Sequence, residues 1–297
     1  MNHQKISVQE SLLESLNKKQ IRWRAKTKID FLWENFMKKN LFIFAAAVFS
    51  AGIMSCKKSE TADLLSQIQK KGKITIAMEG TWAPWTYHDE KNELVGYDVE
   101  VGKKIAEKLG VKAEFVEVDW DGIFAGIDSK RYDLSLNGVE VTQERAFKYD
   151  FSEPYAYTHT ALIVKKDNDL IKKFEDLKDR TTTNSLGSTY AEYAESLGAK
   201  VITIDSFEET LQLVEHGRAD ATLNDNATFF YYQKIKPENP FKLAALTENA
   251  SHVAIPMRKG EETKTLLEAV NKAIEELKQS GELAQISQKY FGADLTK

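Results

Sequence analysis

The sequence predicts an α/β protein of two lobes, each with a central, mostly parallel sheet flanked by helices, joined by a two-strand hinge. Short β-rich runs alternate with helical runs of about ten residues from residue 73 onward. Two extended, β-rich stretches, 157–165 and 252–258, interrupt this alternation. A chain that crosses twice leaves the first lobe, builds the second and returns, which implies a hinge with a cleft between the lobes.

The elements follow in order from hydrophobic periodicity and capping signals. A short helix over 63–69 precedes a strand over 73–78, and Asp98 is placed to cap the next helix, which ends near Gly110. Ser206 begins a capping-box pattern ahead of a helix that runs to residues 216–217. The other predicted strands are 113–118, 133–137, 181–185, 201–204 and 219–223, and the other predicted helices are 121–129, 189–197, 226–232, 261–279 and 282–290.

Residues 41–55 are apolar, but they are shorter than the about 20 residues that a membrane span needs. A short basic start at residues 37–40 precedes them, and Cys56, the sole cysteine, follows. This order is typical of a bacterial lipoprotein signal, so we interpret 37–55 as the signal peptide and Cys56 as the lipidated residue. The alternative is a buried helix with an incidental cysteine. Residues 1–36 are either an extension upstream of the true start or a long n-region.

The predicted organisation after the signal is a tether with a short helix over 56–72, lobe 1 over 73–157, lobe 2 over 158–252, and a return to lobe 1 with the C-terminal helices over 253–297. Without the nine basic and four acidic residues of 1–55, the chain keeps 32 basic and 41 acidic residues, a net charge of −9. This balance argues against a nucleic-acid partner, which needs a basic surface.

Enzyme and metal patterns are missing from the sequence. No GxGxxG, GxxxxGK[ST] or HExxH motif occurs, and the histidines after Cys56 are scattered. The turn at 187–189 lacks the second glycine of a nucleophile elbow. We therefore expect a non-enzymatic protein with no catalytic residue, no cofactor and no metal site.

Three strand-to-helix turns are candidates for ligand binding. Thr142 at a helix start places Arg145 beside free backbone N–H groups, a setting that favours a carboxylate, although Arg145 could instead form surface ion pairs. Asp225 either caps a helix or binds an ammonium group. Residues 187–189 are either a plain cap or a nest of donors for a carboxylate. The aromatic segment 80–85 could line a pocket.

Three segments match the polar amino-acid-binding proteins of ABC importers in order and spacing: GTWAPWTYHDEKNELVGYDVEV at 80–101, WDGIFAGIDSKRYDLSLNGVEVTQERAFKYDFSEPY at 120–155 and ATLNDNATFFYY at 221–232. From about Asp63 to its end, the chain resembles this family of solute-binding proteins, family 3, whose fold is the type II periplasmic binding fold. The resemblance implies an extracytoplasmic protein that closes two lobes on an amino acid and delivers it to the membrane subunits of a permease.

The resemblance also implies roles for individual residues. Arg145 would bind the ligand α-carboxylate, with Ser188 and Thr189 of the Gly187 turn donating from the other lobe. Asp225 would bind the α-ammonium. The backbone of residues Asn137, Gly138 and Val139 would border the carboxylate. The rings of Trp82 and Trp120 would pack on the ligand side chain, and Glu79 would contact the distal end of that side chain. Glu140 departs from the Ser or Thr that many members have, and it would face the ammonium, a distal amine or solvent.

Residues 79–81, the paired tryptophans and the ending FGADLTK resemble the cystine-binding branch, so L-cystine is the preferred ligand. A basic amino acid or glutamine is an alternative ligand. A prephenate- or arogenate-type dehydratase on the same fold is an alternative function, and the sensor part of a larger receptor or of a peptidoglycan-cleaving enzyme is another. We expect a monomer that is held at the membrane by lipid on Cys56.

Overall fold

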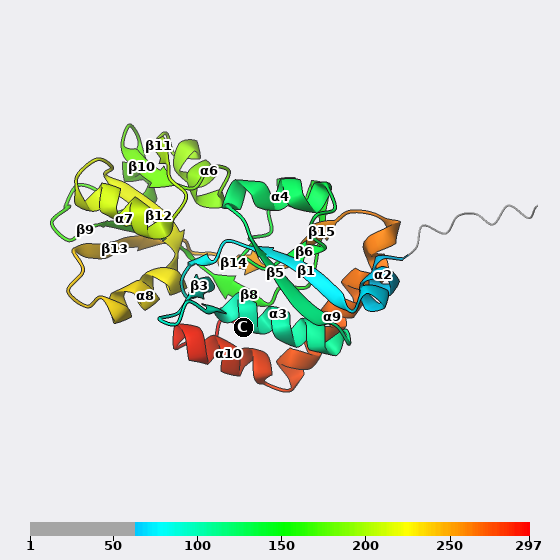
Figure 1. Ribbon diagram of the computed structural model, residues 1–297. Helices are drawn as coiled ribbons and strands as arrows, with labels where there is room; N and C mark the ends of the chain where they lie inside the picture. The colour runs from blue at the N-terminus through cyan, green and yellow to red at the C-terminus, as the bar shows by residue number, and fades with distance from the viewer. Residues whose placement is uncertain (1–62) are drawn as a thin grey trace, which may run out of the picture. The chain divides into compact units, whose positions relative to one another are not determined.

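A computed structural model describes residues 63–297 (Figure 1). The predicted signal peptide, its upstream extension, Cys56 and most of the tether lie outside the described residues. Residues Thr61–Lys297 form one compact unit. Within the part that is described, no helix is both long and apolar enough to cross a membrane.

The first sheet has three parallel strands, a fourth strand that runs antiparallel to them, and an edge strand that is antiparallel to the fourth. Its strand order is β5 (Lys112–Glu117), β1 (Lys73–Met78), β6 (Leu134–Ser135), β15 (Pro256–Arg258) and β7 (Tyr149–Phe151). A small antiparallel sheet accompanies it, made of β2 (Thr81–Trp82), β3 (Thr86–His88) and β4 (Leu94–Val95). Because β15 belongs to the first sheet although residues 152–255 lie between it and β7, the first lobe is discontinuous in sequence.

The second sheet repeats this design. Its order is β11 (Lys200–Thr203), β10 (Thr181–Asn184), β12 (Ala221–Asp225), β9 (Thr160–Lys165) and β13 (Phe241–Leu246). The first three strands are parallel, and β9 runs antiparallel to both of its neighbours. The two lobes are joined where β8 (Ala156–Thr158) pairs antiparallel with β14 (Ser251–Val253), so two neighbouring strands carry the chain across. The predicted α/β architecture with two sheets and a two-strand hinge is confirmed.

Helices cover both sheets (Figure 1). Those of the first lobe are α2 (Leu64–Lys71), α3 (Tyr97–Lys108), α4 (Trp120–Asp128), α5 (Gln143–Lys148), η2 (Glu261–Thr263), α9 (Lys264–Gln279) and α10 (Glu282–Phe291). Those of the second lobe are η1 (Phe174–Leu177), α6 (Thr189–Ser196), α7 (Phe207–Glu215) and α8 (Asn226–Ile235). The largest apolar core lies between the first sheet and α3, α9 and α10, and a second cluster packs α4 on the other face of that sheet.

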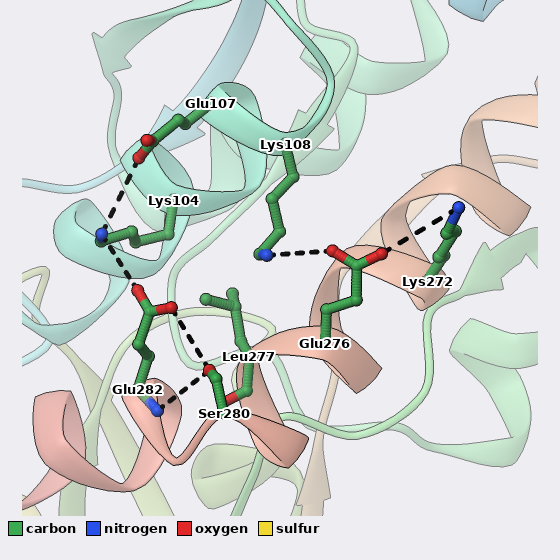
Figure 2. Close-up of polar contacts among 8 residues, drawn as sticks. All are labelled: Lys104, Glu107, Lys108, Lys272, Glu276, Leu277, Ser280 and Glu282. Carbon is green, nitrogen blue, oxygen red and sulfur yellow. Dashed lines mark hydrogen bonds and ion pairs between the residues drawn. The ribbon is translucent and has the colours of Figure 1, made fainter.

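Surface ion pairs link α3 to the two C-terminal helices (Figure 2). Lys108 pairs with Glu276 of α9 at 2.9 Å, and Lys104 pairs with Glu282 of α10 at 3.0 Å. These side chains are partly exposed to solvent, which screens the attraction, so the pairs contribute little to stability. The apolar stripes beneath them, with Val101 and Ile105 of α3 fully buried, contribute more to holding the helices together.

The prediction that Asp98 caps α3 is wrong. The residue before this helix is Gly96, at φ 135°, and a Cβ there would lie 2.1 Å from the carbonyl oxygen of Trp85. Only glycine fits such a close backbone approach. Asp98 is instead buried inside the first turn, where its Oδ2 accepts a hydrogen bond from the Gly138 amide at 2.7 Å. Its role is therefore to hold the loop after β6, which borders the cleft.

Candidate ligand-binding site

A cavity of about 580 Å³, including the part open to solvent, lies between the lobes. The first lobe lines it with Glu79, Thr81, Trp82, Trp120, Gly138, Glu140 and Arg145. The second lobe lines it with Asn184, Ser185, Ser188, Thr189, Tyr190, Asp205, Ser206, Phe207, Thr210 and Asn224. The lining combines aromatic rings with convergent polar groups, which is the usual composition of a small-molecule site.

Arg145 lies where the two lobes meet. The Thr142 side chain accepts from the Arg145 amide at 3.1 Å, so the helix start that sequence predicted for α5 is confirmed. The guanidinium stacks against two aromatic rings, 5.2 Å from the Trp120 centroid and 5.4 Å from that of Phe124. Burial lowers the pKa of Arg145, a shift that nearby Glu140 opposes, yet a guanidinium stays charged. The cavity therefore contains a fixed cation.

The guanidinium is oriented by two carbonyl oxygens. Nη1 donates to Glu140 O at 3.1 Å, and Nη2 donates across the cleft to Gly187 O at 3.2 Å. Arginine has five N–H donors, so three are left for other acceptors once these two bonds are made. The arrangement presents an oriented fork of the kind that binds a carboxylate.

The N-terminus of α6 faces the same cavity from the second lobe. Ser188 caps this helix by accepting from the Ala191 amide at 3.1 Å, and Thr189 is its first residue. Both residues line the cavity. The first backbone N–H groups of a helix lack partners inside it, and the helix dipole favours an anion there. Arg145 and the start of α6 thus offer donors to one anionic group from opposite lobes.

Trp82 and Trp120 are the aromatic walls contributed by the first lobe. The Trp82 ring stacks on that of buried Trp85, with centroids 5.5 Å apart and planes 23° apart. Gly138, at φ 56°, lies directly behind it, and a Cβ at that position would come within 2.6 Å of the Trp82 ring. Gly138 therefore gives the ring its place, with its own backbone held by Asp98.

Glu79 follows β1 and is held by Asn137. Its Oε2 accepts from the Asn137 side chain at 2.6 Å, and its amide donates to Oδ1 of the same side chain at 2.8 Å. Burial raises the pKa of Glu79 to about 7, and the charges of Asp119 and Asp205 add to the rise, while the hydrogen bond from Asn137 opposes it. With Asp205 lining the cavity from the second lobe, this region is rich in carboxylates.

Asp225 and Trp85 connect the lobes. Trp85 Nε1 lies 3.2 Å from Asp225 Oδ2 and 3.1 Å from Thr228 Oγ1. The same carboxylate caps α8, accepting from the Thr228 amide at 2.7 Å and from its hydroxyl at 2.6 Å. Burial raises the pKa of Asp225 to about 6, although these hydrogen bonds oppose the rise. The helix cap that sequence reasoning considered for Asp225 is present in the structure.

The structure brings eight of the twelve predicted ligand-binding residues to the cavity lining: Glu79, Trp82, Trp120, Gly138, Glu140, Arg145, Ser188 and Thr189. The other four do not line it. Asn137 positions Glu79, Val139 is buried with its carbonyl bonded to the Ala254 amide, Gly187 bonds to Arg145 and Asp225 bonds to Trp85.

Sequence reasoning missed the second-lobe residues Asn184, Tyr190, Asp205, Phe207 and Asn224. Asn184 is the last residue of β10, and Asn224 is the last but one of the neighbouring parallel strand β12. Residues at the carboxyl ends of such strands border the ligand crevice in open α/β sheets. Their place at the carboxyl ends of two predicted strands was the sequence signal that could have identified Asn184 and Asn224 as cavity residues. Within residues 63–297, no three metal-binding side chains gather into a potential metal site.

Comparisons with known proteins agree with this geometry. The family model of bacterial extracellular solute-binding proteins, family 3, matches residues 74–293. The L-cystine-binding protein TcyA of Bacillus subtilis (strain 168) is 38% identical over 271 residues, covering 88% of this chain and all of that protein. The L-cystine-binding protein TcyJ of Escherichia coli (strain K12) is 35% identical over 247 residues, covering 82% and 92%.

Solved structures share the fold. An ancestral arginine-binding protein bound to arginine gives a TM-score of 0.69 at 40% identity, covering 74% of this chain and 99% of that one. The L-cystine solute receptor of Neisseria gonorrhoeae, in its unliganded open conformation, gives a TM-score of 0.55 at 38% identity, covering 80% of this chain and 100% of that one. The ancestral amino acid-binding protein AncCDT-1, a precursor of cyclohexadienyl dehydratase, gives a TM-score of 0.71 at 33% identity, covering 77% of this chain and 99% of that one.

Proposed function

Because the chain belongs to the bacterial extracellular solute-binding proteins of family 3, we propose that it binds L-cystine for an ABC amino-acid importer. The observation that supports an amino-acid ligand best is one cavity with an oriented guanidinium, a helix N-terminus and several acceptor groups. A free amino acid has an anionic and a cationic group on the same carbon, so it needs both kinds of partner.

In this proposal the α-carboxylate binds Arg145 and the start of α6, with donors from Ser188 and Thr189. Charge-assisted hydrogen bonds contribute about 1.5–3 kcal/mol each. Two or three of them with aromatic packing reach the about −8 kcal/mol of a micromolar complex. Trp82 and Trp120 pack on the ligand side chain, and Glu79 meets its distal end.

Closure follows from the position of the ligand. Its partners lie on both lobes, so a bound amino acid stabilises the closed arrangement over the open one by its differential affinity. The permease then receives the closed, loaded protein. The family description places this protein outside the cytoplasm, and we propose that lipid on Cys56 anchors it as a monomer to the membrane.

A basic amino acid is a second candidate ligand. Three carboxylates, Glu79, Glu140 and Asp205, line the cavity against one guanidinium. This excess of negative charge favours a ligand with an additional cation. L-cystine has a second ammonium for the distal carboxylates, whereas lysine or arginine has its side-chain cation.

The test is a titration of residues 57–297, freed of bound ligand by unfolding and refolding, with the twenty amino acids and L-cystine. Tryptophan fluorescence and melting temperature report binding. Residues 57–297 contain no cysteine, so no thiol exchanges with the ligand disulfide. Saturation by L-cystine supports the proposal, and saturation by lysine or arginine alone supports the second candidate. If no amino acid binds, the proposal fails, and turnover of prephenate becomes the next measurement.

A further inference from the structure

The two strands that cross between the lobes, β8 and β14, are held by main-chain bonds along their outer edges as well as to each other. On the outer edge of β14, the Val141 amide donates to His252 O at 2.9 Å. On the outer edge of β8, the Tyr157 amide donates to Leu295 O at 2.7 Å. The C-terminal residues therefore return from α10 to the hinge and flank it from the first lobe (Figure 1).

Residues 293–297, which we call the strap, are fixed to the first lobe through α10. Ser287 of this helix is fully buried, and its hydroxyl donates to Ala293 O at 2.7 Å and accepts from the Leu295 amide at 2.8 Å. The Leu295 side chain packs against the largest apolar core. Gly292 ends α10 at φ 72°, a left-handed conformation that lets the chain turn back after a helix. These contacts place Leu295 O against β8.

The bond from Tyr157 to the strap determines which part of β8 can bend. Two residues further on, the His159 amide donates to Asn226 Oδ1 at 2.9 Å, and the His159 carbonyl accepts from the Asn226 amide at 2.9 Å. Tyr157 is thus held by the first lobe and His159 by the second. Only Thr158 lies between them, and it pairs with the other crossing strand. Bending of β8 is therefore confined to Thr158.

Release of the strap would lengthen this flexible stretch. The next residue back, Ala156, pairs with Val253, so Tyr157 would join Thr158 in the part that bends. A residue that is released from its bonds gains backbone entropy. In the closed arrangement, contacts such as that of Trp85 with Asp225 hold the lobes in one geometry, so the gain falls on the open arrangement.

We propose that the strap limits the opening of the two lobes by confining the bending of β8 to Thr158. A shorter flexible stretch allows fewer open arrangements, so a larger share of the molecules is closed at a given ligand concentration. The strap acts on the hinge and not on the cavity, so its effect is the same for every ligand. It goes beyond the proposed function, since it would act with any solute that closes the lobes.

Hydrogen exchange in ligand-free protein, followed by NMR on residues 57–297, tests the strap without any variant. In the wild type, the Tyr157 amide should be protected as strongly as the Tyr155 amide, which donates to Val253 O at 2.9 Å. The Thr158 amide, at the site of bending, should be protected less. A Tyr157 amide that exchanges as fast as that of Thr158 would overturn the proposal.

Two variants release the strap in different ways. Ser287→Ala removes its anchor on α10, and a truncation after Gly292 removes the strap itself. Ser135→Ala is the matched control for the first, because Ser135 is another fully buried serine of the first lobe, and its hydroxyl donates to Ala77 O at 3.0 Å. Removal of Lys297 alone is the control for the truncation. Circular dichroism melts verify that each variant is folded.

Spin labels on one exposed residue of each lobe report how far the lobes open. Asp121→Cys on α4 and Glu195→Cys on α6 supply the labelling sites, since residues 57–297 contain no cysteine of their own. Both strap variants should speed exchange at Tyr157 by about tenfold and shift the interlobe distances to longer and broader values. Faster exchange at Tyr157 with the wild-type distance distribution would overturn the proposal.

Calorimetry then measures the affinity of the unlabelled variants for L-cystine and for a second amino acid that binds. Both strap variants should weaken the two ligands by the same factor, about 3- to 10-fold, because only the closed share changes. Unchanged affinities, or a loss confined to one ligand, would overturn the proposal. Wild-type protein that binds no amino acid would overturn the proposed function, whereas the exchange and distance measurements on ligand-free protein would still decide on the strap.

Discussion

Trp85 Nε1 of the first lobe lies 3.2 Å from Asp225 Oδ2 of the second. Trp85 is fully buried and packs edge-on against Tyr97 and Phe291, so its ring is rigidly held by the first lobe. Asp225 is held by its cap on α8. The contact between these two fixed groups across the cleft stabilises the closed arrangement, and it breaks when the lobes open. We therefore expect the affinity for ligand to depend on a contact outside the cavity lining.

Trp85→Phe should weaken ligand binding by about 5- to 30-fold, because the interlobe hydrogen bonds are lost while the cavity lining is kept. Small-angle scattering with saturating ligand should show a larger fraction of open molecules than in the wild type. Thr228→Val removes one of these two links, the 3.1 Å contact of Trp85 Nε1 with Thr228 Oγ1, and should weaken binding in the same direction but by less. Unchanged affinity in both variants would show that this contact does not contribute to closure.

Arg145→Ala should leave the free protein folded and weaken binding by about 2–5 kcal/mol, since the carboxylate would be buried without its partner. Isothermal titration measures the loss. Arg131→Ala is the control, because Arg131 stacks on Tyr132 and does not line the cavity. Equal affinity of Arg145→Ala and the wild type would remove Arg145 from the site.

Gly138→Ala should both destabilise the protein and disturb the cavity. The new Cβ would meet the Trp82 ring at 2.6 Å, and the backbone there has φ 56°. Gly217→Ala is a matched control with φ 69° and nothing within 4 Å of its Cβ. Both variants carry the about 1–3 kcal/mol of left-handed strain, so the additional loss of melting temperature in Gly138→Ala measures the clash. Equal losses would contradict the close packing.

Ligand-free protein should lose stability as pH rises from about 4 to about 7. Burial raises the pKa of Glu79 from 4.5 to about 7 and that of Asp98 from 3.8 to about 7. In that window the folded state binds more protons than the unfolded state, so deprotonation favours unfolding. Urea titrations at several pH values measure the slope, and Glu79→Gln should reduce it. An identical slope in Glu79→Gln would show that Glu79 titrates normally.

If lipid on Cys56 anchors the protein, a variant without this cysteine should no longer be found with the membrane. Cys56→Ser should release the protein from the membrane fraction when cells are broken, because no acyl chain can be attached at Cys56. Detergent partitioning of the wild type and the variant measures the difference. Wild-type protein that stays in the aqueous phase would contradict lipidation.

Local signals in the sequence predicted the elements well where one helix or strand makes its own contacts. The strand over 73–78 is found as predicted, and Ser188 and Ser206 cap their helices through bonds three residues along the chain. The cap predicted at Asp98 was wrong because the hydrogen-bond partner of its side chain, Gly138, lies forty residues away in the sequence. The same residue type that caps a helix also serves as a buried acceptor, and only the packing around it distinguishes the two.

The sequence by itself determined the order of strands and helices and the two crossings between the lobes, because these depend on short-range patterns. The class of protein and the role expected of Arg145 came from the resemblance of three sequence segments to a known family. Tertiary structure decided which polar atoms remain free at the cavity. Asp225 is occupied by Trp85 and Thr228, while Glu140 Oε1 and Asn184 Oδ1 have no partner among the described residues. The reason is physical. Hydrogen-bond capacity is shared among groups that meet only when both lobes are folded and closed, so it cannot be assigned to one residue from its neighbours in sequence.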